Sequence, residues 1–360
     1  MSLVPRHIRE LPIYKPGRPI EEVRKELSLE RIIKLASNEN PYGASPKAIE
    51  AVQNALSENF RYPDASALKL RNKLAESFDV KVENVVVGAG SEGIISSIMR
   101  TFLQHGDEII AAENSFIGFR VLANATSIHT HWIPMDNYHH DLSAMTEKIS
   151  DYTKIIYLAN PDNPTGTYFT VEEFDLFMER VPSQVLVILD EAYFEYAQHL
   201  SDYPDSMHYR YDNVITLRTF SKAHGLAGFR VGYGFAHEDL IENLNKVKLP
   251  FEPSWPAQVA AVAALDDISY IQKSVDLCKS EMQKLIEVFQ EMNLEVIPSA
   301  ANFLTLVFEG EQEAESFNTS MLHCGIILRH LSGWGLPDCI RITVGTEEEN
   351  EYLIECLQPC

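Results

Sequence analysis

Short apolar runs of strand length alternate with helical stretches along the first two thirds of this 360-residue chain. An apolar run that ends in polar turn residues is typical of a buried parallel strand, and the helices between such runs can cover both faces of a sheet. The pattern therefore predicts a doubly wound α/β domain. We expect its strands near 83–88, 107–112, 128–134, 154–159, 185–190, 214–218 and 231–236.

The pattern changes after residue 237. Residues 237–248 and 268–292 are expected to be helices, the second long and amphipathic. Strands are expected near 295–308, 326–330 and 339–344, which indicates a smaller α+β domain. We therefore expect three parts: an N-terminal arm at 1–40 that contributes to the small domain and to a dimer, a large domain at 41–245 and a small domain at 246–360.

Two of the expected strands end in side chains that suit a ligand site. The strand at 185–190 ends in Asp190, with Tyr193 three residues later, and the strand at 154–159 runs into the turn NPDNPTG, which contains Asn163. Open α/β sheets bind ligands at the carboxyl ends of their strands. A carboxylate there can keep a pyridine nitrogen protonated. The alternatives are that Asp190 caps a turn and that Tyr193 packs in the core.

The stretch RTFSKAHGLAGFRVGYG (218–234) places Lys222 directly after Ser221 in a glycine-rich turn, with Arg230 eight positions on. A lysine amine can act as a covalent catalyst by forming a Schiff base with an aldehyde cofactor. An arginine and a hydroxyl nearby would hold the phosphate of that cofactor. A Ser-Lys pair alone can also be a solvated loop, and the strand-end residues favour the catalytic interpretation.

Three glycines of GAGSEG (88–93) fit the pattern G-x-G-x-x-G between an expected strand and an expected helix. The pattern allows a dinucleotide site, a site for a single phosphate at the helix N-terminus, or a turn without a ligand. Because the lysine and arginine candidates are also present, we assign Gly90, Ser91 and Glu92 to a phosphate. Glu92 would act through its backbone, since its carboxylate repels phosphate.

The apolar run CIRITVGT contains one arginine, Arg341, and GIILRHL contains Arg329 at the end of an expected strand. An arginine inside such a run is costly to bury without an anion. A guanidinium fork suits a carboxylate or a phosphate. Two arginines from adjacent strands could share a pocket with Arg230 and bind two anionic groups, and the alternative is a salt bridge to a protein carboxylate.

Charge and composition exclude several classes of protein. The net charge of −22 argues against binding to nucleic acid. No apolar run approaches the length of a membrane span, and no secretory signal is visible in MSLVPRHIRE. The five cysteines have no metal or disulfide spacing and predict free thiols in a reducing compartment. His129, His131, His139 and His140 are expected to be surface or strand histidines, so no metal is expected.

Taken together, the motifs resemble those of the type I fold aminotransferases that use pyridoxal phosphate (PLP). The resemblance narrows to the histidinol-phosphate aminotransferase family and covers nearly the whole chain. It rests on LASNENPYGASPKAIEAV (35–52), RYPDASALKLRNKLA (61–75), the GAGSEGI turn, NPDNPTG, DEAY, the SK segment and RITVG. The resemblance implies a large doubly wound domain with a mainly parallel seven-stranded sheet, a smaller α+β domain and a cytoplasmic homodimer.

The implied reaction is the transamination of L-histidinol phosphate with 2-oxoglutarate, which gives imidazole acetol phosphate and L-glutamate in histidine biosynthesis. By the resemblance, PLP forms a Schiff base with Lys222, which is also the general base and acid. Asp190 holds the ring nitrogen, Tyr193 and Asn163 reach the ring oxygen, and Phe116 stacks on the ring.

The resemblance also implies how anionic groups are held. The phosphate of PLP meets Ser221, Arg230 and the turn at 90–92, together with Tyr62 of the neighbouring subunit. Tyr14 and Arg329 meet the phosphate of the substrate. Arg341 meets the carboxylate of glutamate or helps to hold that phosphate, and Asn163 also helps to hold a substrate.

Two departures from the family pattern bear on substrate choice. Phe116 replaces the frequent tyrosine, and LPFEPSW (249–255) differs from the usual asparagine-containing loop. An aromatic aminotransferase and a threonine-phosphate decarboxylase of the same fold remain alternatives. More distant ones are a non-catalytic PLP-binding module and a nicotinamide-dependent oxidoreductase built on the glycine pattern.

Overall fold

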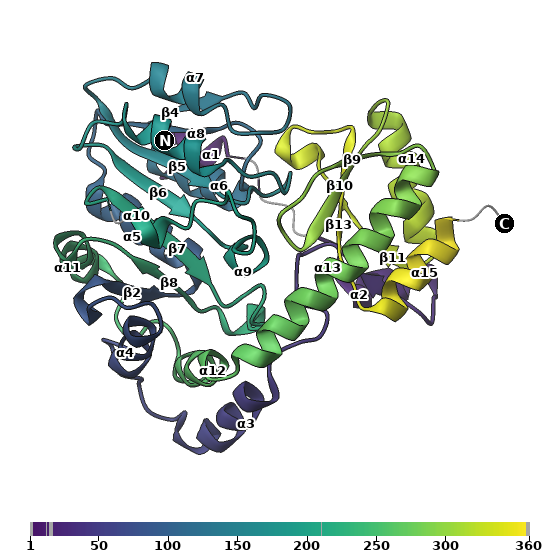
Figure 1. Ribbon diagram of the computed structural model, residues 1–360, viewed down its shortest axis with the longest axis horizontal. Helices are drawn as coiled ribbons and strands as arrows, with labels where there is room; N and C mark the ends of the chain where they lie inside the picture. The colour runs from purple at the N-terminus through teal and green to yellow at the C-terminus, as the bar shows by residue number, and fades with distance from the viewer. Residues whose placement is uncertain (1–2, 12, 14–16, 210, 358–360) are drawn as a thin grey trace.

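The computed structural model describes residues 3–11, 13, 17–209 and 211–357. They form two lobes that lie side by side, and the long helix α13 (Ile268–Glu291) runs from one lobe into the other (Figure 1). None of the helices in these ranges combines the length and the apolar character that crossing a membrane requires.

The large domain is built on a seven-stranded sheet with the order β2-β8-β7-β6-β5-β3-β4. β8 is antiparallel to both of its neighbours, and the other neighbouring strands are parallel. The mainly parallel sheet and its seven expected strands are thereby confirmed. The strands are β2 (Val85–Gly88), β3 (Glu108–Ala112), β4 (His129–Ile133), β5 (Thr153–Ala159), β6 (Leu186–Asp190), β7 (Val214–Thr219) and β8 (Gly232–Phe235).

The central strands are apolar on both faces because both faces are covered. In β5, Ile155, Tyr157 and Ala159 belong to one apolar core, and Ile156 and Leu158 belong to another. Successive side chains of a strand point to opposite faces, so the two cores lie on the two sides of the sheet. A continuous apolar run is the expected signature of such a strand.

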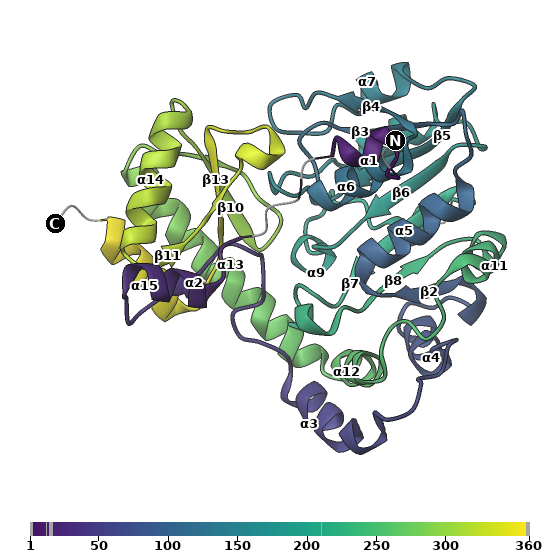
Figure 2. The same ribbon diagram turned by 180° about the vertical axis from the view of Figure 1, so that it is seen from behind.

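Helices α5, α6 and α11 pack in the first of these cores, and α7 and α8 pack in the second (Figures 1 and 2). The α-helices of this domain are α3 (Pro46–Ala55), α4 (Leu68–Ser77), α5 (Gly90–Phe102), α6 (Ile117–Thr126), α7 (Leu142–Glu147), α8 (Val171–Met178), α9 (Phe194–Ala197), α10 (Ser206–Tyr209), α11 (Glu238–Val247) and α12 (Trp255–Leu265). The short 3-10 helices are η1 (Leu56–Glu58), η2 (Val82–Asn84) and η3 (Ala227–Phe229).

The small domain holds a four-stranded antiparallel sheet with the order β12-β13-β10-β9 and a parallel pair, β1-β11. Its strands are β1 (Ile33–Lys34), β9 (Glu295–Ile297), β10 (Phe303–Val307), β11 (Ile326–Ile327), β12 (Arg329–His330) and β13 (Cys339–Thr343). Its further helices are α2 (Ile20–Leu27), α14 (Glu311–His323), η4 (Ser332–Trp334) and α15 (Glu347–Leu357). One apolar core joins α13, α14 and α15 to the sheet.

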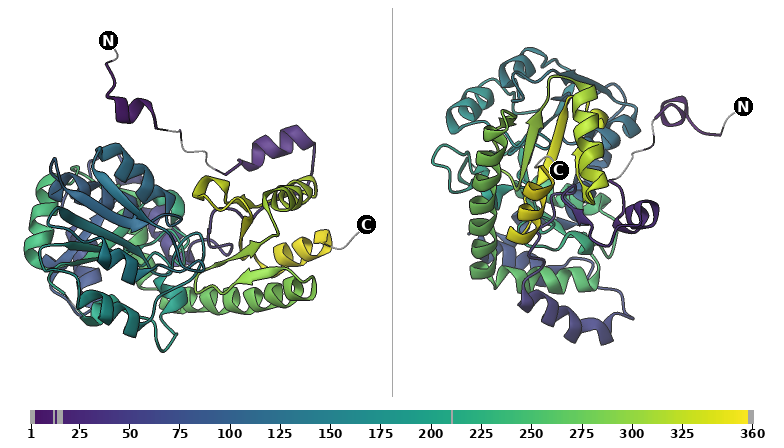
Figure 3. Two further views of the ribbon diagram at one scale, coloured as in Figure 1. Left: turned by 90° about the horizontal axis from the view of Figure 1, so that it is seen from above. Right: turned by 90° about the vertical axis from the view of Figure 1, so that its right-hand side faces the viewer.

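The N-terminal residues contact both lobes. α1 (Arg6–Arg9) lies against α6 of the large domain, whereas α2 and β1 pack on the small domain (Figure 3). α12 packs against α3 and α4, and its alanines belong to the core that also contains Val85 and Val87 of β2. The division at residue 246 stays a prediction. From the packing of α12, we propose that the small domain begins instead near residue 267.

Candidate active site

A cavity of about 210 Å³ lies where the loops after β3, β5, β6 and β7 meet the first turn of α5. The strand order reverses between β3 and β5, because β3 leads outward to β4 while β5 leads to β6 and β7 on the other side. Open α/β sheets bind ligands at such a reversal. Ten residues that the sequence analysis assigned to the cofactor line the cavity: Gly90, Ser91, Glu92, Phe116, Asn163, Asp190, Tyr193, Ser221, Lys222 and Arg230.

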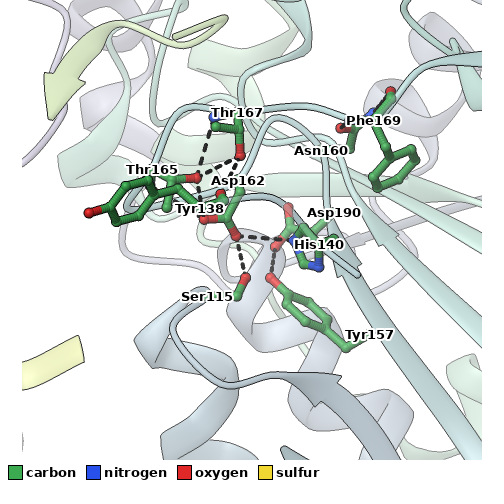
Figure 4. Close-up of polar contacts among 10 residues, drawn as sticks. All are labelled: Ser115, Tyr138, His140, Tyr157, Asn160, Asp162, Thr165, Thr167, Phe169 and Asp190. Atoms are coloured by element: carbon green, nitrogen blue, oxygen red, sulfur yellow. Dashed lines mark hydrogen bonds and ion pairs between the residues drawn. The ribbon is translucent and has the colours of Figure 1, made fainter. Parts of the chain in front are cut away.

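Asp190 is the last residue of β6 and is only 4% exposed. Its Oδ2 accepts a hydrogen bond from the hydroxyl of Tyr157 at 2.9 Å, whereas Oδ1 is buried without a hydrogen-bond partner among the described residues (Figure 4). Burial raises the pKa of Asp190 to about 7, although the bond from Tyr157 acts in the opposite direction. An unpaired buried carboxylate oxygen beside a cavity indicates that a donor of a ligand belongs there.

Lys222 reaches the same cavity from the loop after β7. Its Nζ donates to the carbonyl oxygen of Ser37 at 3.4 Å and lies 5.5 Å from the ring centroid of Tyr193. Burial lowers the pKa of Lys222 to about 8, and the positive charges of Arg341 and Arg230 act in the same direction. In about a tenth of the molecules, Lys222 is therefore the neutral amine at pH 7. The neutral amine is the form that attacks a carbonyl or accepts a proton.

Tyr193 and Asn163 accept hydrogen bonds from residues of other segments. The hydroxyl of Tyr193 accepts a hydrogen bond from Asn38 Nδ2 at 2.8 Å, so its own proton remains for a ligand. Burial raises the pKa of Tyr193 to about 12, which keeps the hydroxyl protonated. Asn163 Oδ1 accepts a hydrogen bond from Arg341 Nη1, and Arg341 Nη2 donates to the carbonyl oxygen of Ala36 at 3.0 Å.

The first turn of α5 closes one end of the cavity. Gly90 has a φ of +74°, and a Cβ at this position would lie 3.1 Å from Arg230 Nη2, so glycine is the residue that fits without strain. Arg230 donates to Ser221 Oγ at 3.4 Å, and its Nη2 lies 3.3 Å from Glu92 Oε2. The carboxylate of Glu92 thus pairs with the guanidinium, while the free N–H groups of the helix N-terminus attract anions.

A second glycine makes room for the aromatic side of the cavity. A Cβ on Gly118 would lie 2.5 Å from both Phe116 Cζ and Glu92 Oε1. The missing side chain allows the ring and the carboxylate to approach the same point. The sequence analysis did not single out Gly118, although a glycine inside a helical pattern is a signal of close approach.

Three of the expected site residues stand apart from these. Arg329 lies opposite Arg341 in the register of the antiparallel strands β12 and β13, but Arg329 does not line the cavity. Tyr62 is 81% exposed and stacks on Phe251 with ring centroids 4.4 Å apart, outside the cavity of its own chain. Tyr14 lies outside the described residues.

The structure also adds residues that the sequence analysis passed over. Tyr157 is buried in β5 and gives Asp190 its hydrogen bond. A hydroxyl inside an otherwise apolar strand was the available signal, because a buried tyrosine usually needs a partner. Residues 36–38 bind Arg341, Lys222 and Tyr193 through side-chain and carbonyl groups. The sequence analysis quoted them within LASNENPYGASPKAIEAV (35–52) but gave them no role.

Cysteines and metal-ligating residues play no visible part in this cavity. Cys278, Cys324, Cys339 and Cys356 are free thiols. In the described ranges, no three histidine, cysteine, aspartate or glutamate side chains come together in a way that could hold a metal ion.

Comparison with known proteins gives a consistent picture. The family model "Aminotransferase class I and II" matches residues 30–357. A histidinol-phosphate aminotransferase 2 of Hydrogenovibrio crunogenus is 42% identical over 98% of this chain and 94% of its own length. A histidinol-phosphate aminotransferase of Halalkalibacterium halodurans is 43% identical over 96% and 94%. The crystal structure of the Sinorhizobium meliloti histidinol-phosphate aminotransferase in complex with PLP superposes with a TM-score of 0.91 at 26% identity and covers 99% of this chain and 97% of that one.

Proposed function

This chain belongs to the class I and II aminotransferases, and we propose that it transfers the amino group between L-histidinol phosphate and 2-oxoglutarate. The products are imidazole acetol phosphate and L-glutamate, and the reaction is a step of histidine biosynthesis. Relatives named for this activity match nearly the whole chain at about 40% identity. The observation that carries the proposal is the meeting of Lys222, Asp190 and Arg230 at one cavity.

The cofactor is PLP, and the residues around the cavity fit its separate groups. When bound, PLP supplies an aldehyde that bonds to amines and a pyridine ring that takes up negative charge. The buried, unpartnered Oδ1 of Asp190 suits the protonated ring nitrogen, and the ring of Phe116 suits the face of the pyridine. Tyr193 and Asn163 suit the ring oxygen, because each borders the cavity with a polar group.

The phosphate of PLP fits the opposite end of the cavity. Gly90, Ser91 and Glu92 form the first turn of α5, where backbone N–H groups face an anion. Ser221 and Arg230 add a hydroxyl and a cation. Because Arg230 already faces the carboxylate of Glu92, it would hold the phosphate and the carboxylate together.

Lys222 is the residue that moves the proton. Its pKa of about 8 lets the amine accept a proton at one stage and return it at another close to neutral pH. Asp190 favours a positive charge opposite it, since its ionised form has one oxygen held by Tyr157 and the other open to the cavity. Tyr193 stays protonated because burial raises its pKa to about 12, so it can donate throughout.

Both substrates carry anionic groups, and buried arginine supplies the matching charge. Arg341 is 4% exposed and contacts Asn163 beside the cavity, and we assign to it the carboxylate of glutamate or a share of the substrate phosphate. Arg329 lies directly across the sheet from Arg341. We assign Arg329 and Tyr14 to the phosphate of histidinol phosphate.

We further propose a homodimer in which Tyr62 completes the site of the neighbouring subunit. Tyr62 stacks on Phe251, and both rings are exposed, as are Leu56, Phe60 and Leu249. α12 packs on α3 and α4, so these side chains belong to one edge of the large domain. Exposed aromatic rings gathered in this way are typical of protein interfaces. The free cysteines and the biosynthetic role favour the cytoplasm as the location.

A mixing experiment tests the shared site. Tyr62→Ala and Lys222→Ala subunits are each expected to be nearly inactive. A mixed dimer rebuilds one complete site, from the lysine of one subunit and the tyrosine of the other. Random exchange should therefore restore about a quarter of the activity of the natural protein. No recovery, although native mass spectrometry shows mixed dimers, would place Tyr62 in the site of its own subunit.

The visible absorption spectrum tests the reaction itself. The purified protein is expected to be yellow with bound PLP, and addition of L-histidinol phosphate without a keto acid should bleach the band. A band that histidinol phosphate leaves unchanged but phenylalanine bleaches would move the substrate class to aromatic amino acids. Release of carbon dioxide from phosphothreonine would instead indicate a decarboxylase. Failure to bind PLP at all would refute the proposal.

A further inference from the structure

A second buried carboxylate, that of Asp162, lies next to the candidate active site (Figure 4). Its Oδ1 accepts a hydrogen bond from Ser115 Oγ and lies 3.2 Å from His140 Nε2. Its Oδ2 accepts from the hydroxyl of Thr165 at 3.0 Å. Asp162 is 0% exposed, and it does not line the cavity. The mechanism proposed above does not use it.

Asp162 and two of its partners come from three different loops. Ser115 follows β3, His140 follows β4, and Asp162 follows β5. These three strands are neighbours in the sheet, in the order β5-β3-β4, and they run parallel. Their carboxyl ends therefore meet at one edge, and the carboxylate of Asp162 links all three loops at that edge. The sequence analysis placed His140 on the surface or in a strand, and this was wrong, because the residue is buried in a loop.

The bond from Ser115 to Asp162 joins the loop after β3 to the loop after β5. In each loop, the residue that follows the bonded one lines the cavity. Phe116 follows Ser115 directly, and Asn163 follows Asp162 directly. Both Phe116 and Asn163 line the cavity. One short link therefore lies between the aromatic ring and the amide that would hold the same cofactor.

We propose that Asp162 is a positioning residue, which through Ser115 and His140 fixes Phe116 and Asn163 relative to each other. The proposal rests on the proposed function, because the two residues are placed for PLP. A side chain bonded to one other loop would orient that loop alone. The carboxylate of Asp162 instead accepts bonds from the loop after β3 and the loop after β4, as well as from Thr165 of its own loop, so none of the three loops can shift without breaking a charge-assisted hydrogen bond.

Further bonds keep Asp162 itself in place. Its N–H donates to the carbonyl oxygen of Thr167 at 2.8 Å, and Thr167 Oγ1 donates to the carbonyl oxygen of Tyr138 at 2.8 Å. Thr305 Oγ1 of the small domain donates to the carbonyl oxygen of Pro164 at 2.7 Å. The loop after β5 is thus attached to the loop after β4 and to the second domain. Ser115 directly precedes Phe116 and donates to Asp162, which makes the serine the residue to test.

Ser115→Ala removes the link while keeping the carboxylate and its other partners. We expect the dissociation constant of PLP to rise about tenfold, as for a hydrogen bond to a charged group. We also expect a weaker circular dichroism signal of the bound cofactor, because the ring is held less rigidly. Ser115→Thr, which keeps a hydroxyl, should restore both. The midpoint of thermal unfolding of the protein without PLP should fall by only a few degrees, because a buried carboxylate loses one of its hydrogen bonds.

The matched control is Ser150→Ala. Ser150 Oγ donates to Glu108 Oε2 at 2.8 Å, which is the same type of bond at the opposite end of β3 and on the surface. Its removal should leave the affinity for PLP and the dichroism unchanged. A double-mutant cycle adds a test of the route: in a Phe116→Leu background, the effect of Ser115→Ala on PLP affinity should fall below about threefold.

The outcomes separate this proposal from the proposed function. Natural protein that binds PLP while Ser115→Ala binds it equally well, with the same dichroism, would overturn the positioning role and leave the reaction intact. An equal loss in the Phe116→Leu background would overturn the route through the ring. Natural protein that binds PLP but does not react with histidinol phosphate would overturn the substrate alone, since the affinity measurements still decide the role of Asp162. Natural protein that does not bind PLP would overturn both.

Discussion

Replacing Asp190 with asparagine is expected to make the protein without PLP more stable, even though it abolishes activity. The unfolded chain loses the proton of Asp190 near its ordinary pKa of 3.8, whereas burial holds the native pKa at about 7. Between these values the native state binds more protons than the unfolded state. The free energy of unfolding therefore falls as the pH rises through this window, and the cost is complete above pH 7.

The difference of about 3 pKa units corresponds to about 4 kcal/mol at pH 8. Asparagine removes this cost. It also places a buried amide where Oδ1 has no partner, and this lowers the free energy of unfolding by about 1–2 kcal/mol. Asp190→Asn should therefore gain about 2–3 kcal/mol at pH 8, or about 3 °C in the unfolding midpoint of a chain of this length. Near pH 4 the gain from the charge disappears.

Thermal unfolding followed by circular dichroism at pH 4.5, 6 and 8 measures this directly in protein stripped of PLP. Asp151→Asn, at an exposed position, is the matched control for the change in net charge. Addition of PLP should reverse the order, because only the carboxylate gains a cationic partner. Equal midpoints at pH 8, or a gain at pH 8 no larger than at pH 4.5, would refute the reasoning.

Three other predictions follow from single contacts. The rate at which the stripped protein captures PLP should rise with pH and level off above about pH 8, because the pKa of Lys222 is about 8. A stopped-flow rate that still rises tenfold per pH unit at pH 9 would contradict this. Gly90→Ala and Gly43→Ala should each lower the free energy of unfolding by about 1 kcal/mol, because both glycines have a positive φ. Equilibrium dialysis should find weaker PLP binding only for Gly90→Ala, since Gly43 faces open space. Tyr157→Phe should cost about 1–3 kcal/mol at pH 8 and less at pH 5.5, because its hydrogen bond favours the ionised carboxylate; urea unfolding that shows the same loss at both pH values would argue against it.

The sequence predicted the large domain well because its signals are local. Most strands of the seven-stranded sheet are apolar runs bounded by turn residues, and such runs can be recognised from the neighbouring residues alone. The strand-end residues Asp190 and Asn163 and the turn at Gly90 were identifiable for the same reason. Their meeting at one cavity follows from the parallel sheet, because parallel strands bring their carboxyl ends to one edge.

What the sequence did not reveal depends on contacts between distant segments. His140 looked like a surface residue because nothing near it in the chain shows that its loop folds over Asp162. The packing of α12 is another example, because its neighbours are α3 and α4, which lie far from it in the sequence. Tyr62 is exposed in the single chain, and the role that we propose for it depends on a second subunit.

Residues 36–38 lie between the two domains and bind Lys222, Tyr193 and Arg341, which lies 305 positions from Ala36. Contacts across so long a loop close late in folding. A growing chain on the ribosome can therefore complete its seven-stranded sheet while the cavity still lacks the arginine of β13. The residues that we assign to PLP are all present at that stage, whereas Arg341, which we assign to a substrate, is not, so substrate binding has to wait for the finished chain.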